Sequence, residues 1–182
     1  MSDQKRPYRM QRRAEAEEAT RQRITESAVA LHEELGPALT TVSAIAERAG
    51  VRRSTMYRHF PDEEALFDAC SSHWRALHPP PDPSGWSSVD EALTALYAFY
   101  AETEGMYTSL LRDEPLVPVM AARLRGFHEY LVAIRDGLVR GKRRRAALGH
   151  ALSFGTWRSL VREQGLSQRD AVAMMAQLVA DA

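Results

Sequence analysis

The chain has 182 residues, 45% hydrophobic and 26% charged, which is the composition of a folded globular protein and excludes a disordered chain. Lys and Arg total 24, Asp and Glu total 24, and this zero net charge gives no sign of a polyanion partner. The single cysteine, Cys70, excludes an internal disulfide framework and indicates a reducing compartment such as the cytoplasm, and the absence of any long apolar run excludes a membrane span or a signal peptide.

The first 17 residues carry no apolar periodicity and are predicted to form a flexible basic arm. Bases precede acids in this arm: Lys5, Arg6, Arg9, Arg12 and Arg13 come first, and Glu15, Glu17 and Glu18 follow. Such an arm is either a solvated tail or a segment that reaches a groove of DNA beside a main contact.

A helix is predicted over residues 20–35, where apolar residues recur at spacings of four, three and four: Ile24, Ala28, Leu31 and Leu35. Gly36-Pro37 ends this helix. A second, short helix is predicted from Val42 to Ala49, with Thr40 or Thr41 able to accept an N-cap hydrogen bond.

After the turn Gly50-Val51-Arg52, a third helix of about two turns is predicted to end at Phe60. A fourth helical stripe, which runs out at His78, comprises Leu66, Cys70, Trp74 and Leu77. The proline-rich segment 79–85 is predicted to be a loop, because proline lacks the amide donor and restricts the residue before it. This loop marks a boundary between two subdomains.

Five further helices are predicted after the loop. The first three carry their apolar stripes at about residues 93–100, 106–111 and 120–138. The fourth runs from about Arg145 to Glu163, and the fifth is begun by Ser167 with Asp170 three residues later, a variant of the capping box. Because no strand pattern occurs, the predicted fold is all-α with about nine helices.

Residues 41–60 read TVSAIAERAGVRRSTMYRHF, which is a short helix, a glycine turn and a second short helix, the pattern of a helix-turn-helix. Ala46 is small where the two helices would cross, and four apolar residues would hold them together: Val42, Ile45, Val51 and Met56. The remaining face is polar and comprises Arg52, Arg53, Ser54, Thr55, Tyr57 and Arg58. Arginine and hydroxyl groups bind phosphate and guanine, so the pattern predicts DNA binding, the alternative being a hairpin with a solvated polar face.

These residues resemble the TetR family of transcriptional regulators. The resemblance covers about residues 18–75 and is strongest from Ile45 to Val51, from Thr55 to Phe60 and from Glu64 to Phe67. For the rest of the chain it rests on helix content and length. It implies a DNA-binding domain over residues 18–78, with the helix-turn-helix at about 41–60, and a helical effector-binding and dimerisation domain over 79–182.

The resemblance also implies roles for single residues. Thr41, Thr55 and Tyr57 would contact phosphates, Arg53, Ser54 and Arg58 would lie at or near bases, and Phe60 would be structural. The sequence departs from the family pattern at two positions. Arg52 stands where the family often has a capping Ser, and Glu63 stands where it often has a Lys that touches phosphate. A DNA contact is therefore not transferred to position 63.

Large side chains after the third helix either fill the core or line an effector pocket. The candidate pocket residues are Trp74, Tyr97, Tyr100, Tyr107, Phe127 and Trp157. The family resemblance favours the pocket, because the C-terminal domain of such proteins usually holds an effector.

Two stripes near the C-terminus indicate how the chain assembles. Small residues occur at every fourth position, namely Ala147, Ala151, Gly155 and Ser159, and allow another helix to approach closely. An apolar stripe on the last helix comprises Ala171, Met175 and Leu178. The stripes either pack on the body of the same chain or form a four-helix interface with a second copy, as two half-sites of a palindrome require.

Other functional classes have little support. The sequence has no nucleophile elbow, Walker loop, dinucleotide fingerprint or HExxH motif, so no enzymatic activity is expected. Cys70 and His73 share a helical face, but no third and fourth ligand is evident, and neither a metal nor another cofactor is expected. The basic run Lys142–Arg145 is interpreted as a solvated turn, with an anionic ligand or a second DNA contact as alternatives.

The predicted function is that of a homodimeric repressor that binds a palindromic operator and responds to a small-molecule effector. The charge distribution agrees with this, because residues 1–60 hold 11 bases and 8 acids while residues 61–182 hold 13 bases and 16 acids. The alternative is a helical ligand-binding or protein-interaction module that has lost DNA binding, which the acidic pair Glu63-Glu64 suggests.

Overall fold

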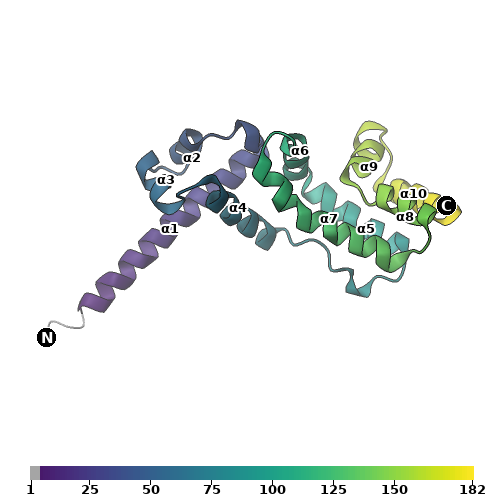
Figure 1. Cartoon of the computed structure of the whole chain (residues 1–182), viewed down its shortest axis with the longest axis horizontal. Helices are drawn as coiled ribbons and strands as arrows, with labels where there is room; N and C mark the ends of the chain where they lie inside the picture. Colours follow the sequence, from purple (N-terminus) through teal and green to yellow (C-terminus); the bar gives the residue numbers. More distant parts are fainter. Residues whose placement is uncertain (1–4) are drawn as a thin grey trace.

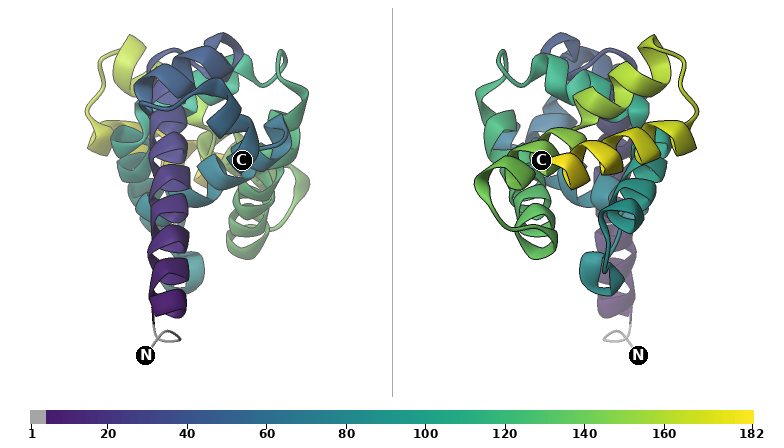
Figure 2. Two further views of the ribbon diagram at one scale, coloured as in Figure 1. Left: turned by 90° about the vertical axis from the view of Figure 1, so that its left-hand side faces the viewer. Right: turned by 90° about the vertical axis from the view of Figure 1, so that its right-hand side faces the viewer.

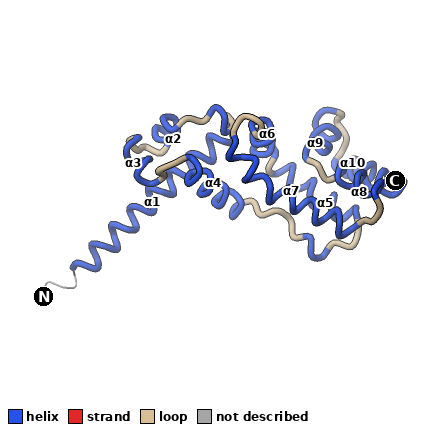
Figure 3. Tube along the Cα trace, viewed as in Figure 1, coloured by secondary structure: helices blue, strands red, loops and turns tan. Residues whose placement is uncertain are grey.

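The computed structural model describes residues 5–182, which form an elongated all-helical molecule with α1 at one end and α10 at the other (Figure 1). Within this range there are ten α-helices and no strand (Figure 3). The all-α prediction is confirmed, and the predicted count of about nine is close.

The first helix, α1 (Lys5–Glu34), begins much earlier than the prediction of a start near Thr20. Residues 5–17 of the expected arm are therefore helical, and residues 1–4 lie outside the described part. Exposed pairs one turn apart explain the extension: Gln11 donates to Glu15 at 3.0 Å, and Arg13 pairs with Glu17 at 3.4 Å. Such pairs stabilise a helix without any apolar stripe, so hydrophobic periodicity does not detect it.

Three short helices pack beside the C-terminal half of α1: α2 (Val42–Arg48), α3 (Arg53–His59) and α4 (Glu63–Leu77). Their common core is that of the predicted stripes and comprises Ile24, Ala28, Leu31, Ile45, Ala46, Ala49, Met56, Phe60, Leu66 and Cys70. Two residues of the predicted stripes are exposed instead: Leu35, because α1 ends at Glu34, and Leu77, the last residue of α4.

The second domain is built around α5 (Val89–Glu102), which begins with a complete capping box between Ser88 and Glu91. The proline-rich segment before it is a loop with a single 3-10 turn, η2 (Pro83–Gly85), as predicted. Two helices follow, α6 (Glu104–Asp113) and α7 (Pro118–Leu138). Figure 1 shows α6 and α7 beside α1 and α4, and the end views of Figure 2 show how narrow the molecule is across its long axis.

The helix predicted over 145–163 is broken in the structure. It consists of α8 (Lys142–Ala151), α9 (Phe154–Arg158) and a π-helical turn, η3 (Ser159–Glu163). Ser153 starts the new helix by accepting a hydrogen bond from the Thr156 amide at 3.1 Å. The last helix, α10 (Gln168–Asp181), is capped by Ser167 as predicted.

Two buried tyrosines of α5 stabilise this break. The Tyr97 hydroxyl donates to the carbonyl of Ala151 at 2.9 Å, and the Tyr100 hydroxyl donates to the carbonyl of Leu152 at 2.7 Å. These carbonyls lie where α8 ends and would otherwise lack a partner in the core. The break thus depends on residues about 50 positions away, which local sequence patterns do not reveal.

The core of the second domain is aromatic and joins α5, α8, α9 and α10. Its largest fully buried side chains are Tyr97, Tyr100 and Trp157. Within the described residues no helix has both the length and the apolar character needed to cross a bilayer.

Candidate functional site

The helix-turn-helix forms as predicted, with α3 over Arg53–His59. Gly50 has φ +66°, a conformation that glycine adopts without strain, and it lets the Val51 amide donate to the Ala46 carbonyl at 2.9 Å. Ile45, Ala46 and Met56 are buried between the helices, so the polar side of α3 faces outward.

The predicted DNA-contact residues lie at the surface of this unit. Six of them have exposed side chains: Thr41, Arg52, Arg53, Ser54, Tyr57 and Arg58. Thr55 is half-buried, and Tyr57 is 49% exposed, which is unusual for a large aromatic side chain and leaves its hydroxyl free for a partner. Arg53 and Tyr57 lie one helical turn apart, as do Ser54 and Arg58, so they form two adjacent rows on α3.

Thr41 and Arg52 occupy the N-cap positions of α2 and α3. The Thr41 hydroxyl oxygen accepts from the Ala44 amide at 3.1 Å, which leaves its proton available to a phosphate oxygen. Arg52 makes no side-chain cap, as expected from its replacement of a serine. Glu63 is exposed in the first turn of α4, after the N-cap Asp62, which accepts from the Ala65 amide at 2.8 Å.

Arg21 of α1 was not predicted from the sequence. It positions α3, the second helix of the helix-turn-helix, which is called the recognition helix in such motifs. Its guanidinium donates to the carbonyl of His59 at 2.7 Å and lies 4.2 Å from the centre of the Phe60 ring. A cation at the C-terminus of a helix is favourable, so Arg21 fixes the end of α3 on α1. No local signal marks this residue, because its partners are 38 and more positions away.

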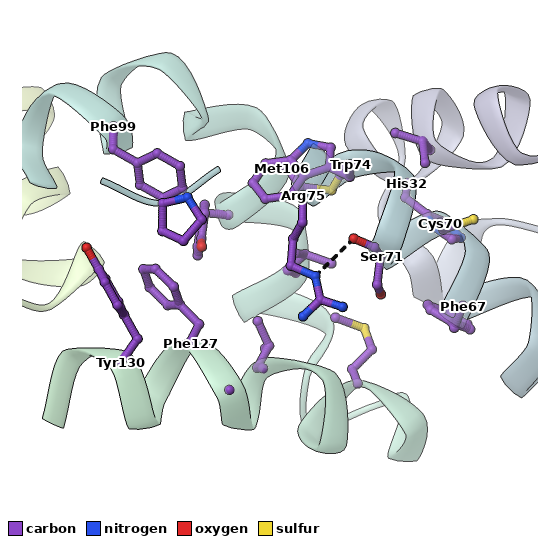
Figure 4. A pocket seen from close by; sticks show the side chains of 17 residues that line it. His32, Phe67, Cys70, Ser71, Trp74, Arg75, Phe99, Met106, Phe127 and Tyr130 are labelled. Atoms are coloured by element: carbon purple, nitrogen blue, oxygen red, sulfur yellow. Dashed lines mark hydrogen bonds between the residues drawn. The ribbon is translucent and has the colours of Figure 1, made fainter. Parts of the chain in front are cut away.

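A cavity of about 240 Å³ lies where the two domains meet, between α1, α4, α6 and α7 (Figure 4). In Figure 4, Phe99, Phe127 and Tyr130 stand at one end of it and His32, Phe67 and Cys70 at the other. The remaining lining residues are Val29, Ser71, Trp74, Arg75, Pro80, Met106, Tyr107, Leu110, Met120, Leu124 and Gly126. The cavity is therefore mainly apolar and aromatic.

Of the six predicted pocket residues, the structure brings three to this cavity, namely Trp74, Tyr107 and Phe127. The other three are fully buried in the core and do not line it: Tyr97, Tyr100 and Trp157. The physical reason is the helix break described above, because it takes up the hydroxyl groups of Tyr97 and Tyr100. Several lining residues were not predicted, among them His32, Arg75 and Tyr130, since they carry no periodic or motif signal.

Burial changes the pKa values of two cavity groups. It lowers the pKa of His32 to about 4, against the opposing effect of the Asp113 charge, so this ring is neutral near pH 7 and stacks on Phe67 at 5.0 Å. It raises the pKa of the Cys70 thiol to about 12, so Cys70 stays protonated and is no reactive nucleophile.

The C-terminus of α6 holds the junction between α1 and α2, where the 3-10 turn η1 (Pro37–Leu39) lies. The Asp113 carboxylate, which is 2% exposed, accepts from the Ala38 amide at 3.0 Å and from Arg112 at 2.7 Å. Arg112 also donates to the carbonyl of Leu35 at 2.8 Å. The hydrogen bonds from Arg112 hold the pKa of Asp113 below its ordinary value. A helix that lines the cavity is thus tied directly to the segment that enters the helix-turn-helix.

The predicted dimer residues divide into two groups. Ala151, Ala171 and Met175 are buried within the same chain, where α10 packs on α5 and α8, so they are not available to a partner. Gly155 and Leu178 are exposed, and Ala147 and Ser159 are half-buried. The four small residues do not form one stripe, because the helix breaks between Ala151 and Phe154.

The basic run at the start of α8 is engaged within the chain at two positions. Arg144 donates to the carbonyl of Val179 at 3.3 Å, near the C-terminus of α10, and Arg145 pairs with Asp136 at 3.1 Å. In the described part of the chain no group of three or more His, Cys, Asp or Glu side chains is placed to hold a metal ion.

The comparisons with known proteins agree with this architecture. Residues 24–70 match the family model described as bacterial regulatory proteins, tetR family. No protein of curated function matches the chain.

Solved structures resemble almost the whole chain at low sequence identity. A tetR-family transcriptional regulator from Streptomyces coelicolor is 20% identical with a TM-score of 0.58, covering 90% of this chain and 78% of its own. The multidrug binding protein EbrR, complexed with imidazole, is 20% identical with a TM-score of 0.60, covering 87% and 93%. The transcriptional regulator FadR from Bacillus subtilis, in complex with stearoyl-CoA, is 18% identical with a TM-score of 0.57, covering 87% and 96%.

The matched segment spans α2 and α3 together with the parts of α1 and α4 that pack on them. The described structure therefore shows a TetR-type fold, and residues 24–70 are identified as the N-terminal DNA-binding domain of the tetR family of bacterial regulatory proteins.

Proposed function

We propose that this regulator is a repressor that binds a palindromic operator as a homodimer and releases it when a small molecule occupies the cavity. The observation that carries the proposal is the position of the cavity. Val29 and His32 of α1 and Phe67, Cys70 and Trp74 of α4 line it, together with residues of α6 and α7. A ligand there contacts both domains and can favour one arrangement of them over another.

The connection between α6 and the α1–α2 junction supports the coupling. Met106, Tyr107 and Leu110 of α6 face the cavity, while Asp113 at the end of the same helix binds the Ala38 amide. A ligand that shifts α6 therefore moves the start of the helix-turn-helix. Because operator binding by a dimer depends on the separation of two recognition helices, a small shift suffices to lower affinity.

In the proposed complex, α3 enters the major groove. Arg53, Ser54 and Arg58 read bases, and Thr41, Thr55 and Tyr57 hold phosphates, with Arg52 beside the backbone. The exposure of these side chains supports the assignment.

The proposed dimer uses the outer face of α8 and α10. Ala146 of α8 is exposed, and so are two large apolar side chains of α10, Met174 at 48% and Leu178 at 43%. Of the predicted apolar stripe on the last helix, this face includes only Leu178. A two-fold pairing of these helices would place two recognition helices for the two halves of a palindrome.

The test is selection of bound DNA from a random pool, followed by titration of the selected site. We expect a palindrome to be enriched. Arg53→Ala should weaken operator binding about tenfold to a hundredfold and relax base preference, because a bidentate base contact is lost. Tyr57→Phe should weaken binding by about fivefold on all sequences, since only a phosphate hydrogen bond is lost.

Arg158→Ala is the matched control, because Arg158 is an exposed arginine in the second domain. Its operator affinity should equal that of the wild type. Failure to enrich any palindrome would instead favour a ligand-binding module without DNA affinity. The exposed carboxylate of Glu63 at the start of α4 would agree with that result, because it would repel phosphate.

A further inference from the structure

Two polar side chains in the cavity wall have no partner in the protein. His32 is 5% exposed and Tyr107 is 4% exposed, and within residues 5–182 neither the His32 ring nor the Tyr107 hydroxyl has a hydrogen-bond partner. By contrast, the hydroxyl groups of Tyr97, Tyr100 and Tyr130 each donate to a backbone carbonyl. The fully enclosed side-chain atoms without a partner, among the described residues, are instead His59 Nε2 and Trp157 Nε1, so the polar atoms of His32 and Tyr107 open onto the cavity. A ligand with polar atoms can pair with them there.

Arg75 gives this site its charge. It is the one formally charged side chain among the described residues that line the cavity, and no Asp or Glu lines it. Its Nε donates to the Ser71 carbonyl at 3.1 Å, which fixes the side chain and leaves the outer guanidinium nitrogens available. Figure 4 shows this guanidinium between the two ends of the cavity.

The guanidinium of Arg75 and the hydroxyl of Tyr107 belong to one neighbourhood. Both side chains line the cavity, and the ring of Trp74, the residue before Arg75, lies 5.8 Å from the Tyr107 ring. Burial raises the pKa of the Tyr107 phenol well above its ordinary value, and the positive charge of Arg75 opposes that increase. Together they present N–H and O–H donors on the cavity side, a combination that suits a carboxylate.

The walls beside these donors are aromatic. The Tyr107 ring centre lies 4.9 Å from that of Phe127 and 5.8 Å from that of Trp74, and Phe99 and Phe127 are 6.1 Å apart. Such surfaces bind a flat ring by edge and face contacts in addition to the burial of apolar area.

The volume limits the size of the ligand. A cavity of about 150 Å³ holds benzene. In proportion, the 240 Å³ of this cavity corresponds to about ten non-hydrogen atoms, which is one aromatic ring with a short acidic side chain.

We propose that the cavity binds a small aromatic monocarboxylate, with its ring among Trp74, Phe99 and Phe127 and its carboxylate on Arg75 and the Tyr107 hydroxyl. The inference rests on the function proposed above and adds the chemical class of the effector. An organic cation is disfavoured, because it would face Arg75 with no carboxylate in the cavity wall to compensate.

The experiment is isothermal titration calorimetry of the full-length protein with four probes of nearly equal size: 3-phenylpropionate, its neutral amide 3-phenylpropanamide, the cation 3-phenylpropylamine, and the aliphatic acid octanoate. The aromatic acid should bind at least tenfold more tightly than the amide, because a charge-assisted contact is worth about a factor of ten or more. It should also bind more tightly than octanoate, and the amine should not bind.

Three variants locate the contacts. Arg75→Gln should reduce the affinity for 3-phenylpropionate about tenfold and abolish the preference over the amide, and Tyr107→Phe should reduce it about threefold to fivefold while the amide is affected less. Arg125→Gln is the matched control, an exposed arginine on α7 that does not line the cavity, and it should bind as the wild type does. Circular dichroism should show the same helix content for all three variants.

Several results would overturn the ligand class: equal binding of acid and amide, tighter binding of the amine or of octanoate, no binding of any probe, or an unchanged acid preference in Arg75→Gln. None of these bears on operator selection, so they leave the proposed regulator in place. Loss of the regulator function would show instead as a failure to select an operator.

Discussion

The two candidate sites differ in where they lie: one is an exposed polar surface and the other is an internal cavity. In the DNA-binding domain, Ile45, Ala46 and Met56 are buried so that the polar side chains of α3 face outward. The proposed effector site is internal instead, a cavity where the two domains meet, whose aromatic walls are continuous with the core of the second domain. An outward site is read from a short stretch of sequence, whereas an internal one is defined by residues from five helices and a loop.

The largest loss of stability is expected from a substitution at the junction between the domains. Gly36 has φ +88° and ψ 156°, a region essentially restricted to glycine, and a Cβ there would overlap the Arg112 guanidinium and the Asp113 carboxylate. Gly36→Ala should therefore lower the free energy of unfolding by about 2 to 3 kcal/mol, through backbone strain and the displaced contacts of the buried Asp113 carboxylate with the exposed Arg112.

Chemical denaturation measures this effect. Gly85→Ala is the control, because Gly85 has no positive φ and a Cβ there meets no atom within 4 Å. If both variants are as stable as the wild type, the junction is not held by Asp113 and Arg112 as described.

A second effect is the dependence of the free energy of unfolding on pH, which His32 causes. Burial lowers the pKa of His32 from 6.5 to about 4, so on acidification the unfolded chain takes up the proton first. Stability is then complete above about pH 6.5 and falls between pH 6.5 and 4, by about 3 kcal/mol in total at about 1.4 kcal/mol per pKa unit.

His32→Phe keeps a ring against Phe67 and removes the titration, so the free energy of unfolding should vary less between pH 6.5 and 4. The Asp113 contribution is lost at lower pH, since the pKa of its carboxyl lies below its ordinary value of 3.8. An identical pH profile in the variant and the wild type would show that His32 is not buried in a neutral form.

The smallest expected effect concerns the N-terminal turns of α1. Arg9, Arg12 and Arg13 are exposed, and the N-terminal half of α1, to which they belong, extends away from the rest of the molecule at the end that carries α2 and α3 (Figure 1). Replacing all three with Gln should make the slope of log affinity against log salt for non-specific DNA shallower by about 1 to 3, because fewer counterions are released. Replacing Lys142 and Arg143 with Gln should leave the slope unchanged, and equal slopes for all proteins would mean that α1 does not reach DNA.

The sequence predicted the DNA-binding domain closely because each of its determinants is local. The turn glycine, Ala46 at the crossing and the apolar positions 24, 28 and 31 all act within a few residues of one another. The exception is the start of α1, which polar side-chain pairs stabilise without an apolar stripe.

The second domain was predicted only in outline. Its helix count and proline loop follow from local patterns, but the break after Ala151 depends on Tyr97 and Tyr100. That single long-range feature moved Tyr97 and Tyr100 out of the expected pocket and disrupted the expected small-residue stripe. The polar residues of the cavity, His32 and Arg75, carry no signal in the sequence because only the tertiary structure brings them together.

If the cavity controls DNA binding as proposed, filling it with a side chain should weaken operator affinity, and Gly126 is the position at which to do so. Gly126 on α7 lines the cavity, and a Cβ there meets no atom within 4 Å, so Gly126→Leu would place a side chain where the ligand binds. Gly137→Leu is the matched control, on the same helix, equally open and away from the cavity.

The decisive measurement is the dissociation constant of the selected operator for these two variants and the wild type, by fluorescence anisotropy without added ligand. We expect Gly126→Leu to bind the operator at least about tenfold more weakly, the scale of an allosteric coupling of about 1–3 kcal/mol, and Gly137→Leu to bind as the wild type does. Equal operator affinity in all three proteins would contradict this expectation.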